Sequence, residues 1–149
     1  MQSKKVRHVI GKFPYIHSLD RLSLAEEIEK RAETLNLTVK CFVQANVSGE
    51  QSKYGLPPER LPQFLQKLNV FSRIQVIGLM TMAPFEEDPE KTRPVFRSLR
   101  EWRNRLNEEA VYRAPITELS MGMSNDFEVA VEEGATWVRL GTILVGKNE

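Results

Sequence analysis

Strand-like and helix-like segments alternate along this chain, and that alternation limits its fold more than any other feature of the sequence. Short apolar runs predict strands, and apolar residues three and four positions apart predict helices. The predicted strands cover residues 15–19, 39–45, 74–82, 116–120 and 136–140. Helical patterns fill the segments between them. Regular β-α alternation of this kind is typical of an α/β protein with a parallel sheet and helical crossovers.

Two parallel architectures fit this order of elements: an open doubly wound sheet and a (β/α)8 barrel. A complete barrel typically needs about 200–250 residues, whereas the chain has 149. Length therefore excludes an intact barrel and leaves an open sheet or a barrel that lacks some of its units. Because the length suits one domain and no Ser/Gly/Pro-rich linker interrupts it, we expect residues 1–149 to form a single domain.

A few residues mark where the predicted helices begin and end. Ser23 and Glu26 have the spacing of a capping box, so the first helix should begin near residues 20–23. Asn36 is typical of a helix C-terminus. Asp88 stands before a proline, which is the pattern of a helix N-cap. The last predicted helix runs from about residue 124 to 133.

The charge balance narrows the range of partners. The chain has 21 basic and 20 acidic residues, for a formal net charge of +1. Nucleic-acid binders usually show a clear basic excess and polybasic anchors a cluster, so we expect neither a nucleic acid nor a membrane as partner. A single cysteine, Cys41, and the lack of a secretory signal favour the cytoplasm. His8 and His17 lack metal-ligand spacing, so we expect no metal site.

The ends of the last two predicted strands carry the most informative residues. In parallel α/β folds the chemistry gathers where strands end. Ser124 is predicted to stand just before a helix, where backbone N–H groups are unpaired. Gly122 and Gly141 allow close approach of the backbone. Two such loops in succession match the phosphate-binding arrangement of many barrels, although a helix cap and simple turns explain the same residues.

Other side chains near the strand ends also leave alternatives open. Arg139 either contacts a ligand inside the barrel or is an ion-paired strand-end residue. Four methionines either fill the core or form an apolar wall for a flat ligand; they are Met80, Met82, Met121 and Met123. The sequence shows no GxGxxG motif, Walker loop or Ser-His-Asp set.

Several stretches at these strand ends resemble one known family. They are residues 119–127 (LSMGMSNDF), 132–136 (EEGAT), 138–142 (VRLGT), 17–20 (HSLD), 44–55 (QANVSGEQSKYG) and 78–84 (GLMTMAP). With them the chain resembles the pyridoxal phosphate homeostasis proteins of the YggS/PROSC type, over essentially its whole length and in the same order. The Ser-Met-Gly-Met-Ser run followed by Arg-x-Gly-Thr is highly specific to that family.

The resemblance implies a barrel like the N-terminal domain of alanine racemase that holds pyridoxal 5′-phosphate (PLP). It also implies a non-enzymatic role in vitamin B6 and amino-acid balance. The family's phosphate site corresponds to Ser124, Gly141 and Thr142, with Arg139 beside it. The resemblance places five more residues in the wall of the PLP pocket: Ser120, Met121, Gly122, Met123 and Asn46.

One departure from the family bears directly on the cofactor. The family's Schiff-base lysine lies at the end of the first barrel strand, and that strand and the next two have no counterpart here. Residues 1–5 match the segment just after the third strand. We therefore expect a truncated barrel, roughly its C-terminal five-eighths, whose open edge favours self-association. PLP held without a covalent bond should bind in the micromolar to millimolar range.

Two other functions stay open at this point. The first is a PLP-dependent, racemase-like enzyme, which the missing lysine opposes, as does the missing second domain that supplies a catalytic base in alanine racemases. The second is a plain phosphate-ligand-binding module on an open α/β sheet. Binding of inorganic phosphate but not of PLP would favour this last function.

Overall fold

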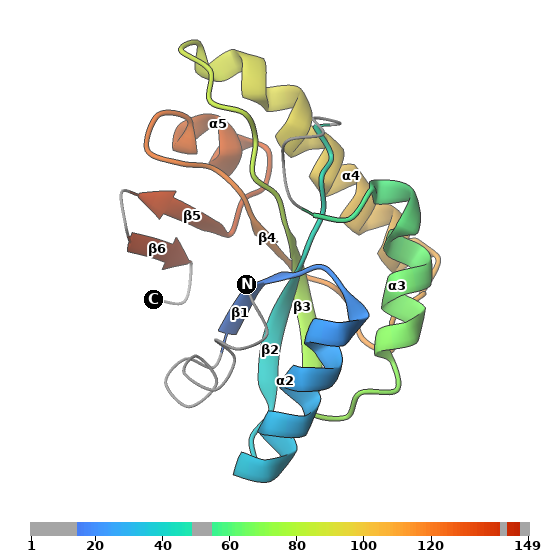
Figure 1. The fold of residues 1–149 in the computed structure, drawn as a ribbon. Helices are drawn as coiled ribbons and strands as arrows, with labels where there is room; N and C mark the ends of the chain where they lie inside the picture. The colour runs from blue at the N-terminus through green and yellow to red at the C-terminus, as the bar shows by residue number, and fades with distance from the viewer. Residues whose placement is uncertain (1–14, 49–54, 141–142, 147–149) are drawn as a thin grey trace.

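The computed structural model describes residues 15–48, 55–140 and 143–146, and within these ranges one sheet holds six strands in chain order (Figure 1). Five of the strands are parallel: β1 (Tyr15–Leu19), β2 (Val39–Gln44), β3 (Ile74–Met80), β4 (Glu118–Ser120) and β5 (Trp137–Leu140). Each strand pairs with the next one along the chain. This order confirms the parallel sheet predicted from the β-α alternation.

Helices connect the strands and cover the outer face of the sheet (Figure 1). They are α2 (Leu22–Leu35), α3 (Leu61–Leu68), α4 (Arg93–Glu108) and α5 (Phe127–Glu132), with the short 3-10 turns η2 (Pro58–Arg60) and η3 (Pro89–Thr92) before α3 and α4. The predicted apolar stripe of α3 is buried; it consists of Leu61, Phe64, Leu65 and Leu68. Each such side chain contributes about 1.5–3 kcal/mol when fully buried, so helix–sheet packing is a major stabilising term.

The sheet curls until side chains of distant strands meet on its concave face. The ring of Tyr15 in β1 lies 5.3 Å from the ring of Trp137 in β5, centroid to centroid, although three strands separate them. Phe42 of β2 packs edge-on against the same indole at 6.0 Å. Gly78 of β3 makes room for this packing, because a Cβ there would lie 2.7 Å from the Phe42 ring. Five parallel strands curled in this way form part of a barrel, as predicted.

The sixth strand was not expected from the sequence. β6 (Ile143–Gly146) runs antiparallel to β5, with a register that begins at the pair Leu140↔Ile143. Two residues connect the paired positions, as in the shortest hairpins, and these two residues lie outside the described ranges. The run of β-branched and aliphatic residues that starts at Ile143 suits a strand, but sequence alone does not say that the chain reverses before it.

The helix ends confirm some of the predicted signals and correct one. Asn36 ends α2 in the left-handed conformation, with φ 55°. Asp88 accepts a hydrogen bond of 3.0 Å from the N–H two residues later and opens η3. The capping-box prediction is wrong, because α2 begins one residue before Ser23 and takes Arg21 as its N-cap. Residue spacing alone could not tell which side chain lies outside the first turn.

Candidate functional site

The carboxyl ends of β2 to β5 meet at one edge of the sheet because these strands are parallel. Backbone hydrogen bonds extend the ladder beyond the strand ends: Ala45 N–H to Met80 O (2.9 Å), Thr81 N–H to Ser120 O (3.1 Å), Met121 N–H to Trp137 O (3.0 Å) and Arg139 N–H to Gly122 O (3.0 Å). The Thr81 hydroxyl adds a bond of 2.7 Å to the carbonyl of Ala45. Main-chain bonds therefore fix the segments after β3 and β4 against each other and against β5.

A pocket lies at this edge, and five of the residues predicted for the site line it. They are Ser120, Met121, Gly122, Met123 and Arg139. Ser120 comes from β4 and Arg139 from β5, and the other three follow β4 directly. The two strand ends singled out in the sequence are therefore neighbours in space.

Four methionines make up most of the apolar lining. Met80 and Met121 are buried, Met82 is half-buried and Met123 is 44% exposed. Met121 also belongs to the main hydrophobic core. Met80 and Met121 therefore fill the core and also line the pocket, whereas a methionine wall for a flat ligand stays a prediction. Their flexible thioethers can adapt to the surface of a flat ligand.

Gly122 is required by the packing of the loop that follows β4. Its φ is +104°, a conformation that L side chains rarely adopt. A Cβ at this position would also lie 2.6 Å from the Cβ of Ala130 in α5. The close approach predicted for this glycine is therefore present, and the group approached is α5.

Asp126 lines the same pocket and was not among the predicted site residues. Its side chain is buried, and its Oδ1 accepts a hydrogen bond of 2.7 Å from the N–H of Met123. Asp126 is the N-cap residue of α5, yet its side chain makes no bond to that helix. The sequence placed Asp126 only near the start of a helix. The direction of its side chain depends on the folded loop, so the sequence pattern could not predict it.

Arg139 and Asp126 supply the charged groups of the described lining. The Arg139 side chain is half-buried. Among residues 15–48, 55–140 and 143–146 it has no ion-pair or hydrogen-bond partner. Arg139 thus lines the pocket, and its contact with a ligand stays a prediction.

The other predicted site residues lie elsewhere or outside the described ranges. Ser124 is exposed and lines a neighbouring hollow, and α5 begins three residues after it rather than directly after it. Asn46 follows β2, where its N–H donates to the carbonyl of Leu56 (2.8 Å) and its Oδ1 accepts from the Ser48 hydroxyl (3.0 Å). It does not line the pocket. Gly141 and Thr142 are outside the described residues.

Near the pocket, an ion-pair cluster joins α4 to the residue that follows α5. The Glu133 carboxylate is nearly buried and contacts three guanidinium groups, those of Arg93 (2.8 Å), Arg97 (3.2 Å) and Arg100 (3.2 Å). Hydrogen bonds from Arg97 and Arg93 lower the pKa of Glu133 from 4.5 to about 2. Because α5 follows the pocket loop, this cluster anchors the far side of that loop.

The described residues lack three features of other functional classes: a metal-binding cluster, a reactive thiol and a membrane-spanning helix. They contain no group of three or more histidine, cysteine, aspartate or glutamate side chains placed to hold a metal ion. Burial raises the pKa of the Cys41 thiol from 9.0 to about 12, which makes it a poor nucleophile. No helix in these ranges is both long enough and apolar enough to cross a membrane.

With the fold and the pocket established, comparison with known proteins identifies the family. Residues 3–149 match the family described as "Alanine racemase, N-terminal domain". The chain belongs to this family. Alanine racemase of Clostridium difficile 630, in complex with cycloserine, shares the fold of this domain, with a TM-score of 0.72 at 20% identity over 95% of this chain and 38% of the racemase chain.

Curated relatives from this family bear the name predicted by resemblance. A pyridoxal phosphate homeostasis protein of Aquifex aeolicus is 47% identical over 100% of this chain and 64% of its own length. A protein of the same name from Synechocystis is 36% identical over 98% of this chain and 66% of its own length. These matches confirm the resemblance. The chain spans slightly less than two thirds of the length of these relatives.

Solved structures extend the similarity to the backbone. PipY of Synechococcus elongatus PCC7942, with PLP bound, superimposes with a TM-score of 0.84 and is 36% identical, over 95% of this chain and 65% of PipY. PipY without PLP gives a TM-score of 0.85 over 95% of this chain and 66% of PipY. This alanine racemase N-terminal domain therefore has close structural counterparts both with and without PLP.

Proposed function

We propose that this chain binds PLP at the pocket between β4 and β5 and serves, without catalysis, in PLP and amino-acid homeostasis. The observation that carries the proposal is the convergence of Ser120, Gly122 and Arg139 in one pocket at the carboxyl edge of a parallel sheet. Two independent lines support it: the names of the curated relatives and the PLP-bound structure of PipY.

The lining suits the parts of PLP. PLP supplies an aldehyde on a flat aromatic ring together with a phosphate ester. The methionine wall offers the ring an apolar surface, and Arg139 offers the phosphate a positive charge. Ligand pockets typically combine such an apolar lining with a few placed polar groups.

The phosphate itself is assigned to the loops after β4 and β5. Ser124, Gly141 and Thr142 follow the pocket residues within a few positions in the sequence, and they carry hydroxyl and backbone N–H donors. Asn46 would close the pocket from the β2 side. Ser124 lies on the neighbouring hollow in this structure, so binding requires its loop to turn that hydroxyl toward the ligand.

A non-enzymatic role is supported by the names of the relatives and by the lining. The described pocket residues include no lysine, the residue that covalent PLP chemistry uses. The remaining charged groups are one guanidinium and one carboxylate, and the carboxylate is engaged by the Met123 N–H. The lining therefore holds a ligand better than it moves protons.

The experiment is a titration of the full chain with PLP and with pyridoxal, which lacks the phosphate. We expect a PLP Kd between about 1 μM and 1 mM and clearly weaker binding of pyridoxal. Arg139→Gln should weaken PLP binding about tenfold or more while leaving pyridoxal binding unchanged. Equal affinity for both ligands would contradict a phosphate site here, and PLP-dependent racemisation of an amino acid would contradict the non-enzymatic role.

A further inference from the structure

The Asp126 side chain accepts a hydrogen bond from the pocket loop (residues 121–126) and not from the helix that it begins. An aspartate at an N-cap normally accepts a hydrogen bond from an N–H of the first helical turn. Asp126 is the N-cap of α5 but makes no such bond. Its Oδ1 turns back and accepts from the Met123 N–H at 2.7 Å, and its own N–H donates to the Met123 carbonyl at 3.1 Å.

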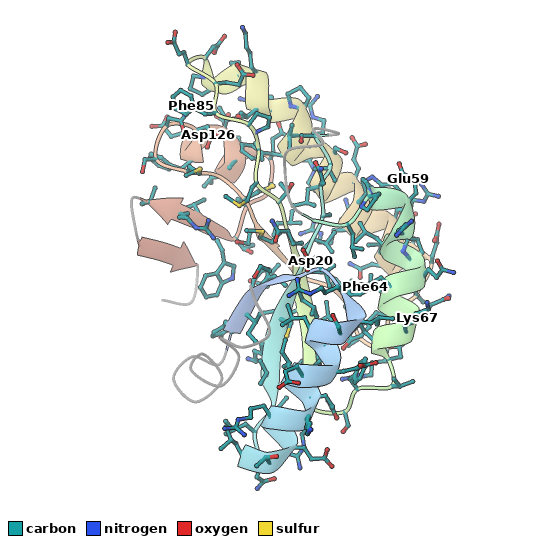
Figure 2. The ribbon with its side chains drawn as sticks, in the orientation of Figure 1. Asp20, Glu59, Phe64, Lys67, Phe85 and Asp126 are labelled. Atoms are coloured by element: carbon teal, nitrogen blue, oxygen red, sulfur yellow. The ribbon has the colours of Figure 1, made fainter. Side chains whose placement is uncertain are left out.

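This pair of bonds closes the loop at the point where the loop lines the pocket. Met123 and Asp126 are both lining residues, and Asp126 also forms part of the neighbouring hollow that contains Ser124. Asp126 lines both the pocket and the hollow that contains Ser124, and it is only 6% exposed. It therefore lies between these two spaces. Figure 2 shows it beside α5, near Phe85 of the loop after β3.

The rest of the loop is held from outside. The Asn125 amide donates to the Glu86 carbonyl at 2.9 Å, which ties this loop to the one that follows β3. Between Gly122 and α5, however, the described contacts supply the Met123 N–H with one acceptor, the Asp126 carboxylate. Without that acceptor a partly buried N–H would lose its partner, and the loop would open toward solvent to recover one.

We propose that Asp126 is a positioning residue for this pocket: its carboxylate holds the Met123 N–H and thereby keeps residues 121–123 in place along the pocket wall. The proposal rests on the proposed function and adds to it a residue that acts through the loop. What Asp126 contributes is a hydrogen-bond acceptor, so an uncharged acceptor of the same shape replaces it.

The test uses three variants of the full chain, Asp126→Ala, Asp126→Leu and Asp126→Asn. Two readouts are measured: PLP affinity by titration and hydrogen exchange of the Met123 amide by NMR without PLP. Asp126→Ala should speed exchange of that amide and weaken PLP binding about five- to thirtyfold. Asp126→Leu removes the acceptor but keeps the bulk, so it should do the same. Asp126→Asn should retain both protection and affinity.

A matched control separates this effect from general loss of stability. Asp88 also accepts a bond from a nearby N–H, that of Glu90 at 3.0 Å, but it does not line the pocket. Asp88→Ala should leave PLP affinity unchanged, and thermal melts of all four variants identify any that fails to fold.

Two results would overturn the proposal: wild-type affinity in both acceptor-free variants, or an Asp126→Asn variant as weak as Asp126→Ala. A wild-type chain that binds no PLP would instead refute the proposed function and, with it, any role of Asp126 in binding.

Discussion

Gly122 and Gly134 have the same positive φ but different surroundings. Both have φ +104°. A Cβ on Gly122 would lie 2.6 Å from the Cβ of Ala130, whereas the nearest atom to a Cβ on Gly134 is the Cδ of Arg100 at 3.3 Å, on a flexible side chain. Alanine variants at these two positions can therefore distinguish the cost of a positive φ from the cost of a steric clash.

We predict that Gly122→Ala is more destabilising than Gly134→Ala. Both variants bear the cost of an alanine at positive φ, but Gly122→Ala must also push α5 away from the loop. The difference should be about 1–3 kcal/mol in the free energy of unfolding, measured by urea denaturation. Equal losses in the two variants would show that α5 yields freely at this point.

The phosphate assignment is tested at Thr142. Thr142→Val keeps the shape of the side chain and removes its hydroxyl donor, so PLP affinity should fall by about 1–2 kcal/mol, or several-fold to thirtyfold. Gly141→Val should lose more, because a side chain would enter the space that the phosphate needs. Titrations are paired with thermal melts, and Thr142→Val should melt like wild type. Unchanged affinity in both variants would place the phosphate elsewhere.

At the scale of elements, two carboxylates link α4 to the end of α5, and Glu133 makes most of the contacts. Glu133 is 5% exposed and contacts three arginines, whereas its neighbour Glu132 is 62% exposed and contacts only Arg93 among the described residues. The pKa of Glu133 falls to about 2 because Arg97 and Arg93 donate hydrogen bonds to its charged form. The ion pairs between Glu133 and α4 therefore depend on that carboxylate being ionised.

This pKa shift predicts an acid-dependent loss of stability. A carboxylate whose folded pKa is depressed stabilises the fold fully above its unfolded pKa. Its contribution is lost as the pH falls from about 4.5 toward 2. Glu133→Gln should therefore lower stability at pH 7 and show a smaller further loss over that pH window. Urea midpoints measured from pH 7 to pH 2 check this, with Glu132→Gln as the control expected to follow wild type.

The sequence predicted those helices and strands that a regular spacing of apolar residues specifies. The stripe from Leu61 to Leu68 and the order of the parallel strands are direct consequences of burial on one or both faces. It failed where local geometry decides the outcome. Ser23 and Glu26 have capping-box spacing, but the helix already begins at Leu22. The sequence also did not indicate that the chain reverses direction before β6.

The candidate site was predictable to the extent that it sits at strand ends. Ser120, Gly122 and Arg139 lie together because parallel strands bring their carboxyl ends to one edge. Asp126 was missed because its role depends on a side chain that turns backward from a helix start. The outward position of Ser124 follows from the late start of α5, which the residue pattern did not reveal.

At the scale of the whole molecule, the described pocket lining contains no lysine. We therefore predict that PLP binds this chain without a stable covalent bond to protein. Borohydride reduction in the presence of PLP, followed by peptide mapping, should yield no single stoichiometrically modified lysine. Lys53, which follows the predicted strand 39–45 in the sequence, is the lysine to examine first. Full modification of one lysine would contradict the prediction.

The chain order of the strands also has a consequence for how the molecule forms. Because each strand pairs with the strand that precedes it, every new ladder needs only one strand–helix unit beyond the sheet already built. Each loop closure then joins neighbouring units and costs little conformational entropy. This favours growth of the sheet from the amino to the carboxyl end during synthesis. In such a sequence the pocket appears late, because it needs β4, the Asp126 loop and β5 together.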